Sequence, residues 1–228
     1  MLKLYHSSTS PNSRRVWIAL LEKELQFELI PLNLNGDQFQ PEFLKLNPFH
    51  HVPVLVDDGN SVVESLAILD YLEAKYPTPA LMPTDAKAVA TVRMVEMVTV
   101  NELMPAIAAL LPIFLNLPIG AEKIEQAKQK TSTVLEFFES LLDDRPYFCS
   151  ENLTLAEVFA GPVITQLHSL GISLGNYPKL GAWSERLMER AAWVMTQPSP
   201  EAWEATKTRI KAVITRQTSH PQIPEKAP

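Results

Sequence analysis

The sequence predicts a small α/β domain followed by an all-helical domain, and three observations support this fold class. Over residues 1–78, short β-like runs alternate with helical runs in the order β-α-β and then β-β-α. Pro77 and Pro79 end the last of these helices, because proline lacks a backbone N–H and restricts the residue before it. Beyond them, long helical segments follow and no convincing strand is found. We expect an α/β domain at 1–78, a linker at 79–86, an all-helical domain at 87–216 and a mobile tail at 217–228.

The elements of the α/β domain are predicted from apolar spacing and turn residues. Val16, Ala19 and Leu20 share one face of its first helix. A turn at Asp57–Asn60 connects the last two strands. The expected strands are Leu2–Tyr5, Phe27–Leu32, Pro53–Val56 and Ser61–Val63, and the expected helices are Pro11–Glu24 and Glu64–Lys75.

The second domain is expected to contain five helices, at Lys87–Asn116, Glu122–Leu142, Thr154–Ser169, Pro178–Glu189 and Glu201–Thr215. Pro105 and Pro112 should kink the first of them, and such bends commonly shape the wall of a cavity. Thr154 and Glu157 have the spacing of a capping box, which predicts a structural role for both.

The composition excludes several function classes. A net charge of −6 without a dense Lys/Arg stripe argues against nucleic acid as a partner. No apolar run approaches the roughly 20 residues of a spanning helix, so we expect no membrane residence. Cys149 is the single cysteine, which excludes an internal disulfide and indicates a reducing, cytoplasmic setting. The glycines form no phosphate-binding loop, and His50-His51 lacks a ligating companion, so neither a permanently bound cofactor nor a metal is expected.

The first candidate site is the start of the first helix at Ser10-Pro11. Ser is a favoured N-cap and Pro a favoured first helical residue, so a structural role alone would explain both. A helix N-terminus also favours an anion, to which a hydroxyl can donate. Such a site would favour a thiolate over a thiol by about 1.4 kcal/mol per unit of pKa depression. Asn12 and Ser13 could supply a second donor and Thr9 could replace Ser10, and the sequence leaves this choice open.

Two further segments could bind a peptide-like ligand. A cis bond at Val52-Pro53 would turn the backbone of Val52 toward a cleft, although a strand start would also explain the proline. Glu64 and Ser65 open the following helix, where such residues commonly serve as caps. The same turn suits an amino-acid head group, because Ser65 and backbone N–H groups would take its carboxylate while Glu64 faces its ammonium.

In order and spacing, these three segments resemble the soluble glutathione transferase family over nearly the whole chain. The stretch Ser10–Leu20 is similar to the phi and zeta classes, whose catalytic serine precedes the position of Arg14 by four residues, and Ser10-Pro11-Asn12 is similar to the Thr-Pro-Asn of the nu class. The resemblance implies a thioredoxin-like N-terminal domain, with Ser10–Ser13 in place of Cys-x-x-Cys. It also implies an all-helical C-terminal domain and a homodimer.

The resemblance implies that reduced glutathione is the cosubstrate and that Ser10, helped by Asn12, stabilises its thiolate. It assigns the other contacts by position: the cysteinyl backbone to Val52 beside Pro53, the γ-glutamyl group to Glu64 and Ser65, and the glycine carboxylate to Gln38 and His51. The family commonly has a small residue and then Lys or Gln where His50-His51 stands. A histidine that is mostly neutral at pH 7 would hold a carboxylate less strongly.

The second substrate is expected to be a small hydrophobic electrophile. Its candidate pocket residues are Ser7, Ser8, Met97, Asn101, Met104 and Pro105. The predicted reaction is attack of the glutathione thiolate on an electrophilic carbon. The alternatives are a glutathione-dependent peroxidase, a zeta-like cis-trans isomerase, for which the fuller Ser-Ser-Cys-Ser-Trp motif is lacking, and a non-catalytic ligand-binding or scaffold protein.

Overall fold

The N-terminal domain is built on one four-stranded sheet with the order β2-β1-β3-β4. The computed structural model describes residues 1–219, and its strands are β1 (Leu2–His6), β2 (Phe27–Pro31), β3 (Val54–Asp57) and β4 (Asn60–Val63). β1 pairs in parallel with β2 and antiparallel with β3, and Leu4 lies opposite Leu29 on one side and Leu55 on the other. The parallel β1–β2 pair requires a crossover, which α1 (Pro11–Glu22) supplies.

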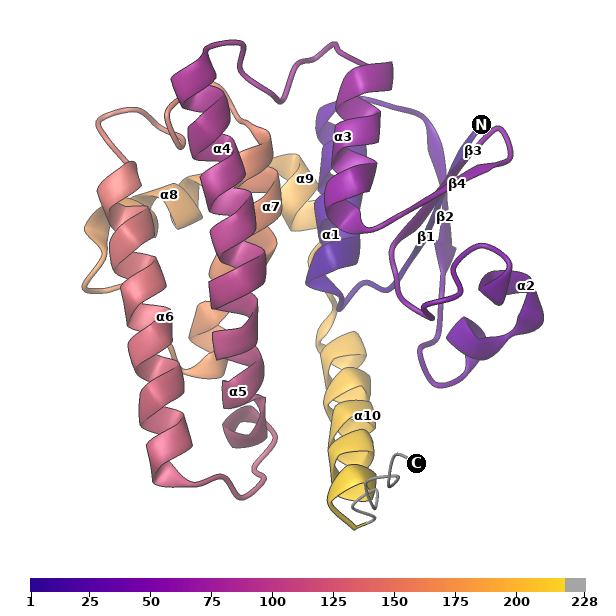
Figure 1. Ribbon diagram of the computed structural model, residues 1–228, viewed down its shortest axis with the longest axis vertical. Coiled ribbons are helices and arrows are strands. Elements are labelled where there is room, and N and C mark those ends of the chain that lie inside the picture. Colours follow the sequence, from indigo (N-terminus) through magenta and orange to yellow (C-terminus); the bar gives the residue numbers. More distant parts are fainter. Residues whose placement is uncertain (220–228) are drawn as a thin grey trace, which may run out of the picture.

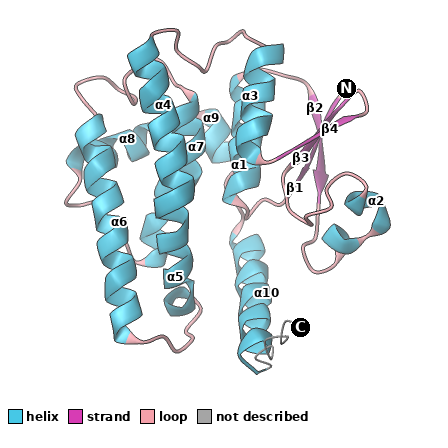
Figure 2. Cartoon of the chain, in the orientation of Figure 1, coloured by secondary structure: helices cyan, strands magenta, loops and turns pink. Residues whose placement is uncertain are grey.

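Helices cover both faces of this sheet (Figure 1). α1 and α3 (Ser65–Lys75) lie between the sheet and the second domain, whereas α2 (Pro41–Leu44) lies on the opposite side (Figure 2). Leu4, Val16, Leu55 and Ile68 are fully buried and belong to the main core. A smaller core under α2 contains Phe43 and Val54. The sequence did not predict α2 or the short 3-10 turn Asp37–Phe39, because both are too short for a periodic apolar pattern.

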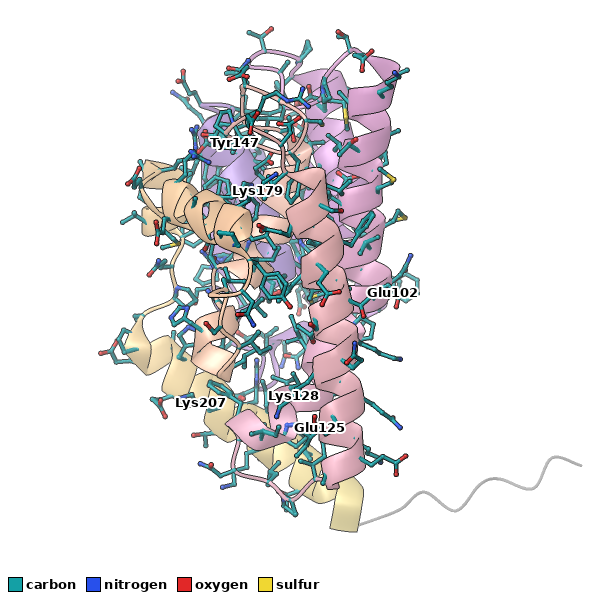
Figure 3. All side chains as sticks on the ribbon, turned by 90° about the vertical axis from the view of Figure 1, so that its left-hand side faces the viewer. Glu102, Glu125, Lys128, Tyr147, Lys179 and Lys207 are labelled. Atoms are coloured by element: carbon teal, nitrogen blue, oxygen red, sulfur yellow. The ribbon has the colours of Figure 1, made fainter. Side chains whose placement is uncertain are left out.

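The second domain is all-helical in its described part, apart from an isolated bridge between Tyr147 and Ser150. Its elements are α4 (Ala86–Val98), a π-helical turn (Thr99–Leu103), α5 (Met104–Phe114), α6 (Ala121–Leu141), α7 (Leu155–Ile164), a 3-10 turn (Leu167–Leu170), α8 (Pro178–Met188), α9 (Ala191–Met195) and α10 (Pro200–Ser219). On α6, charged residues such as Glu125 and Lys128 point outward and pair at 3.2 Å (Figure 3).

α7 is the central helix of this domain, and all its residues are buried. A Cβ on Gly161 would lie 2.9 Å from Leu187 and 3.0 Å from Trp193, so only glycine allows these helices to approach so closely. The predicted capping box is present: Thr154 accepts from the helix backbone, and Glu157 accepts from the N–H of Thr154 at 2.9 Å.

The predicted kink near Pro105 takes the form of the π-helical turn at Thr99–Leu103. Proline cannot donate to the carbonyl four residues earlier, and a π turn absorbs the displaced hydrogen bonds. Pro112 lies inside α5, which ends two residues later at Phe114.

The segment Ala86–Phe114 is long and apolar enough to cross a membrane, judged by length and composition alone. This corrects the expectation that no apolar run approaches that length, because the helix continues through both of its prolines. Core helices of soluble proteins meet the same criterion. Here the segment places Val92, Val95, Leu103 and Ile107 in the main core.

Other differences from the predicted elements occur at helix ends. The helix expected at Thr154–Ser169 stops at Ile164, and the 3-10 turn after it ends at Gly171, whose φ of 76° suits glycine. α9 was not expected. α10 continues to Ser219, and the remainder of the predicted tail, 220–228, lies outside the described residues.

Side-chain contacts join the two domains close to the start of α1. The Arg15 Nε donates to the carbonyl of Phe159 at 2.9 Å, and its guanidinium lies 3.7 Å from the centroid of the Phe159 ring. Arg190 pairs with Glu22 at the other end of α1, at 2.9 Å. The Arg15 contact holds the start of α1 against α7, and the Arg190 contact holds its end against the segment before α9.

Candidate functional site

The site is built around the first turn of α1, where Ser10 is the N-cap. Its Oγ accepts a hydrogen bond from the backbone N–H of Ser13 at 3.3 Å. A hydroxyl that accepts one bond retains its proton for another partner. No acidic side chain lies in the first turn of α1, so the positive end of the helix is not neutralised by the chain itself.

The neighbouring hydroxyls are engaged elsewhere. Ser13 is fully buried, and its Oγ accepts from the backbone N–H of Ser7 at 3.2 Å. The Oγ1 of Thr9 is hydrogen-bonded to the Oγ1 of Thr206 on α10 at 2.8 Å. Because Ser13 is out of reach of a ligand and Thr9 is paired with Thr206, Ser10 is the hydroxyl of this segment that is best placed to donate to a ligand.

Ser10 lies at the junction of two cavities. The first, which we call the polar cavity, has a volume of about 320 Å3. It is lined by Ser10, Asn12, Leu34, Asn47, His50, His51, Val52, Pro53, Glu64 and Ser65. The structure thus brings together seven of the eight residues predicted for the sulfur and for glutathione binding, from three separate segments of the chain.

Gln38 is the exception. Its Nε2 donates to the carbonyl of Leu34 at 3.0 Å and its Oε1 accepts from the N–H of Gly36 at 3.2 Å. The side chain of Gln38 therefore closes its own loop and does not line the polar cavity.

The loop before β3 is held by Asn47, which the sequence did not single out as a site residue. Asn47 is buried, donates to the carbonyl of His51 at 2.8 Å and accepts from the N–H of Phe49 at 3.0 Å. The Val52–Pro53 peptide bond is cis. No sequence motif identifies Asn47, because its hydrogen bonds form only in this conformation of the loop.

The first turn of α3 forms the wall of the polar cavity opposite this loop. Glu64 has a φ of 68°, and its side chain makes no capping bond to the helix. Non-glycine residues at positive φ commonly store strain at ligand sites. Ser65, the first helical residue, is buried apart from 7% of its surface. This turn presents backbone N–H groups to an anion and a carboxylate to a cation.

Two buried arginines lie behind the first turn of α1. Burial lowers the pKa of Arg14 to about 10 and that of Arg15 to about 9, an effect that the charge of Glu96 partly offsets for Arg15. The Oδ1 of Asn12 accepts a hydrogen bond from Arg15. Because its oxygen is engaged in this way, the amide Nδ2 is the group of Asn12 that can donate to a ligand.

The second cavity, which we call the apolar cavity, has a volume of about 230 Å3 and shares Ser10 and Leu34 with the first. α5, α7 and α10 form its walls. Its other lining residues are Thr9, Pro11, Met104, Ile107, Ala108, Leu111, Phe114, Leu115, Pro162, Val163, Gln166, Ser169, Leu170, Trp203, Thr206, Lys207, Arg209 and Ile210.

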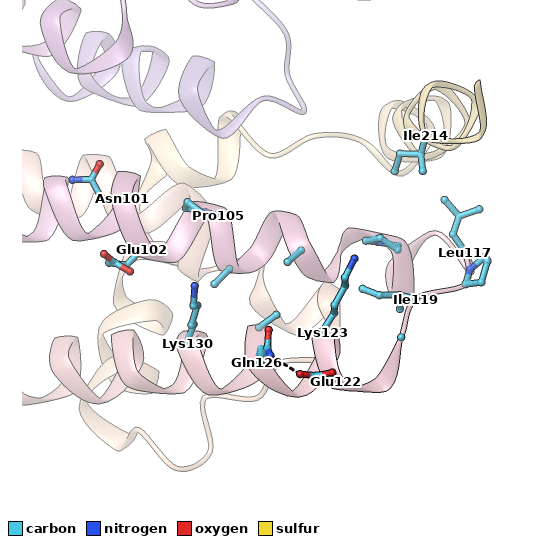
Figure 4. A pocket seen from close by; sticks show the side chains of 16 residues that line it. Asn101, Glu102, Pro105, Leu117, Ile119, Glu122, Lys123, Gln126, Lys130 and Ile214 are labelled. Atoms are coloured by element: carbon cyan, nitrogen blue, oxygen red, sulfur yellow. Dashed lines mark hydrogen bonds between the residues drawn. The ribbon is translucent and has the colours of Figure 1, made fainter. Parts of the chain in front are cut away.

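Of the residues predicted for the electrophile pocket, Met104 lines the apolar cavity and the others lie elsewhere. Asn101 and Pro105 line a third cavity of about 860 Å3 between α5 and α6, which we call the outer groove (Figure 4). Met97 is 40% exposed. Ser7 and Ser8 line neither the polar nor the apolar cavity. Along α5 the lining of the apolar cavity continues from Met104 to Ile107, Ala108 and Leu111, whereas the predicted spacing runs back from Met104 to Met97 and Asn101.

Comparison with known proteins gives the family. Residues 4–80 match the family model described as glutathione S-transferase, N-terminal domain, and residues 99–191 match the glutathione S-transferase, C-terminal domain. The chain belongs to the glutathione S-transferase family. The predicted family, two-part fold and transferase activity are therefore confirmed.

Individual relatives of this transferase agree with that result. A maleylacetoacetate isomerase from Mus musculus is 31% identical over 201 residues, which cover 86% of this chain and 91% of that protein. Glutathione transferase F7 from Populus trichocarpa has a TM-score of 0.75 at 29% identity, over 86% of this chain and 97% of the other. A glutathione transferase homologue from Sulfitobacter, solved with bound glutathione, has a TM-score of 0.72 at 26% identity, over 86% and 96% of the two chains.

Proposed function

We propose that this transferase conjugates reduced glutathione, bound in the polar cavity, to a small electrophile held in the apolar cavity. The observation that carries the proposal is the position of Ser10, which lines both cavities and caps α1. A thiolate beside its hydroxyl would sit at the positive end of a helix and face the second substrate.

The rest of the tripeptide is assigned to the walls of the polar cavity. The backbone of Val52 pairs with the cysteinyl residue, and the first turn of α3 takes the γ-glutamyl group. There Ser65 and free N–H groups bind the carboxylate while Glu64 faces the ammonium. His51 is the remaining candidate for the glycine carboxylate, because Gln38 is engaged in its own loop.

The chemistry follows from stabilising the thiolate. Glutathione releases its thiol proton to water on binding, and the resulting thiolate attacks the electrophilic carbon and forms a C–S bond. In a substitution the leaving group departs with its electron pair, and in an addition the new carbanion takes a proton from water. The hydroxyl of Ser10 and the Nδ2 of Asn12 hold the sulfur without being consumed.

A glutathione-dependent isomerase is the second candidate, because curated relatives include maleylacetoacetate isomerases. In that reaction the thiolate adds to a cis double bond, the intermediate rotates, and the same thiolate leaves. Glutathione is then required but not consumed.

One assay separates the two. Purified protein is incubated with glutathione and either chlorodinitrobenzene or a cis maleyl compound, and both product and free thiol are measured. Loss of thiol in step with product supports conjugation. Turnover of the maleyl compound at constant thiol supports isomerisation, and absence of both reactions contradicts the proposal.

We further propose that the enzyme is a cytoplasmic homodimer. Met94, Met97 and Val100 are spaced by three residues along α4 and the π-helical turn, and each is about 40% exposed. Such a row of apolar side chains is typical of a surface that a partner covers. Sedimentation equilibrium should give twice the chain mass, and Met97→Glu should give the monomer.

A further inference from the structure

We propose that the electrophile of this enzyme carries an anionic group, such as a carboxylate, and that Arg209 of α10 binds it. The inference rests on the proposed function, because it names the substrate class of the apolar cavity. The inference is based on the charged side chains that line that cavity.

The apolar cavity has a one-sided charge distribution. Among its described lining residues there is no Asp or Glu, whereas Lys207 and Arg209 are both present. Both cations come from α10, which contributes five of the residues that line the cavity. A purely hydrophobic substrate would gain nothing from either charge.

The charge of Lys207 is already compensated by neighbouring groups of the chain. Its Nζ lies 2.6 Å from the Oε1 of Glu204 and 4.8 Å from the centroid of the Phe114 ring. Lys207 therefore serves to hold α10 against α5, and its charge is balanced within the chain.

Arg209 differs, because within the described part of the chain it makes no hydrogen bond or ion pair. Its side chain is partly buried, and this burial lowers its pKa. Partial removal of a guanidinium from water without a counterion has a cost, and a carboxylate from the substrate would offset that cost through a bidentate contact. Among the described residues that line the cavity, none is an acid that could do the same.

The position of Arg209 suits a substrate that also reaches the sulfur. Trp203, Thr206 and Ile210 line the same cavity, so α10 presents one face to it. Thr206 touches Thr9, the neighbour of Ser10. Arg209 follows Thr206 by three residues, which is about 4.5 Å along the helix axis. A substrate whose reacting carbon lies at the sulfur beside Ser10 would therefore extend into the part of the same cavity that Arg209 lines.

Arg209 would also offset the repulsion between two anions. The thiolate of glutathione and the substrate acid must approach within one small cavity, where their like charges disfavour each other. A cation near the acid removes that penalty. We therefore expect the contact to lower KM for the acid and to leave kcat almost unchanged.

The test compares a chlorodinitrobenzoate with its methyl ester in the glutathione conjugation assay. The two molecules have the same leaving group and nearly the same shape, and only the acid can pair with Arg209. In Arg209→Gln, kcat/KM for the acid should fall by at least about tenfold, the equivalent of one charged hydrogen bond. For the ester, kcat/KM should change less than twofold.

Two variants serve as controls. Lys211→Gln removes the same charge from an exposed position of α10 that does not line the cavity, and it should leave the acid-to-ester ratio unchanged. Arg209→Lys keeps the charge and should retain most of the preference for the acid. Circular dichroism of each variant checks that the fold is kept.

The outcomes separate the inference from the proposed function. If the wild type conjugates neither these compounds nor chlorodinitrobenzene, the proposed function fails and the inference fails with it. If it conjugates chlorodinitrobenzene but not the acid, only the inference is overturned. If the wild type conjugates the ester but Arg209→Gln lowers kcat/KM equally for the acid and the ester, only the inference is overturned. The inference would also be overturned if Lys211→Gln lowered kcat/KM for the acid as much as Arg209→Gln does, because the effect would then come from the general charge of α10.

Discussion

Replacing Ser10 separates its two roles, as helix cap and as donor to the thiolate. In Ser10→Ala the bond to the N–H of Ser13 is lost, and we expect a loss of stability of about 1 kcal/mol. Loss of a hydrogen bond to a charged sulfur costs about 1.5–3 kcal/mol, which raises the pKa of bound glutathione by about one to two units.

The expected rate effect follows from the fraction of thiolate. If the bound thiol has a pKa of about 6.5, roughly three-quarters is ionised at pH 7. A rise to about 7.5–8.5 leaves roughly a quarter to 3% ionised, so kcat/KM at pH 7 should fall about 3- to 25-fold. At pH 9 most of this difference should disappear, because the thiol ionises in both proteins. The assay is the pH profile of kcat/KM for the electrophile, measured at saturating glutathione so that the bound thiol is the group that titrates.

Two matched variants isolate the donor role. Ser10→Gly also lacks the hydroxyl but costs only a few tenths of a kcal/mol as an N-cap, so it should match Ser10→Ala in rate and exceed it in stability. Ser13→Ala removes a buried hydroxyl that bonds to Ser7, and it should lower stability without shifting the pH profile. A pH-independent loss of rate in Ser10→Ala would refute the reasoning.

Three further predictions concern residues around the site and the core. Asn47→Ala should raise KM for glutathione about tenfold with little change in kcat, because the carbonyl of His51 loses its partner and the loop relaxes. Glu157→Gln should lower the free energy of unfolding by about 3 kcal/mol in urea titrations, because an amide replaces the carboxylate that accepts from Thr154 and Phe148. Burial lowers the pKa of His6 in the folded protein. As the pH drops below about 6.5, the unfolded chain therefore binds a proton at His6 before the folded protein does, and the free energy of unfolding falls. The variant His6→Phe should flatten that part of the curve of stability against pH.

Each of these three predictions has a control variant or a result that would contradict it. Asn176→Ala, at an exposed position, should leave KM unchanged, and an equal change in kcat for Asn47→Ala would argue against a positioning role. Glu189→Gln, also exposed, should alter stability by less than about 0.5 kcal/mol. An unchanged slope of stability against pH in His6→Phe would show that His6 is not the group responsible.

Most residues that line the polar cavity could be predicted as a group because their signals are local. A cap at Ser10, a proline after Val52 and a helix start at Ser65 are each visible as short motifs, and the β-α-β order predicts that they meet at one end of the sheet. Gln38 does not line this cavity, because its side chain bonds within its own loop, beside a 3-10 turn that the sequence does not reveal.

The residues that line the apolar cavity could not be predicted in the same way. Its walls come from α5, α7 and α10, and their relative rotation depends on packing, on the π-helical turn before Met104 and on the position of α10. Trp203 and Arg209 follow an ordinary amphipathic pattern, so nothing in the sequence distinguishes them from core and surface residues. The contacts of Thr206 with Thr9 and of Lys207 with Phe114 show that α10 packs over this cavity, and no sequence pattern predicts them.

The most direct test of the account is an ultraviolet titration of glutathione bound to the wild-type enzyme, in which the absorbance of the thiolate is followed against pH. Stabilisation by Ser10 and the first turn of α1 predicts a midpoint near neutral pH, about two units below the value of about 8.5 for a free thiol. A midpoint equal to that of free glutathione, measured at saturating protein, would contradict the central claim that this helix start stabilises the thiolate.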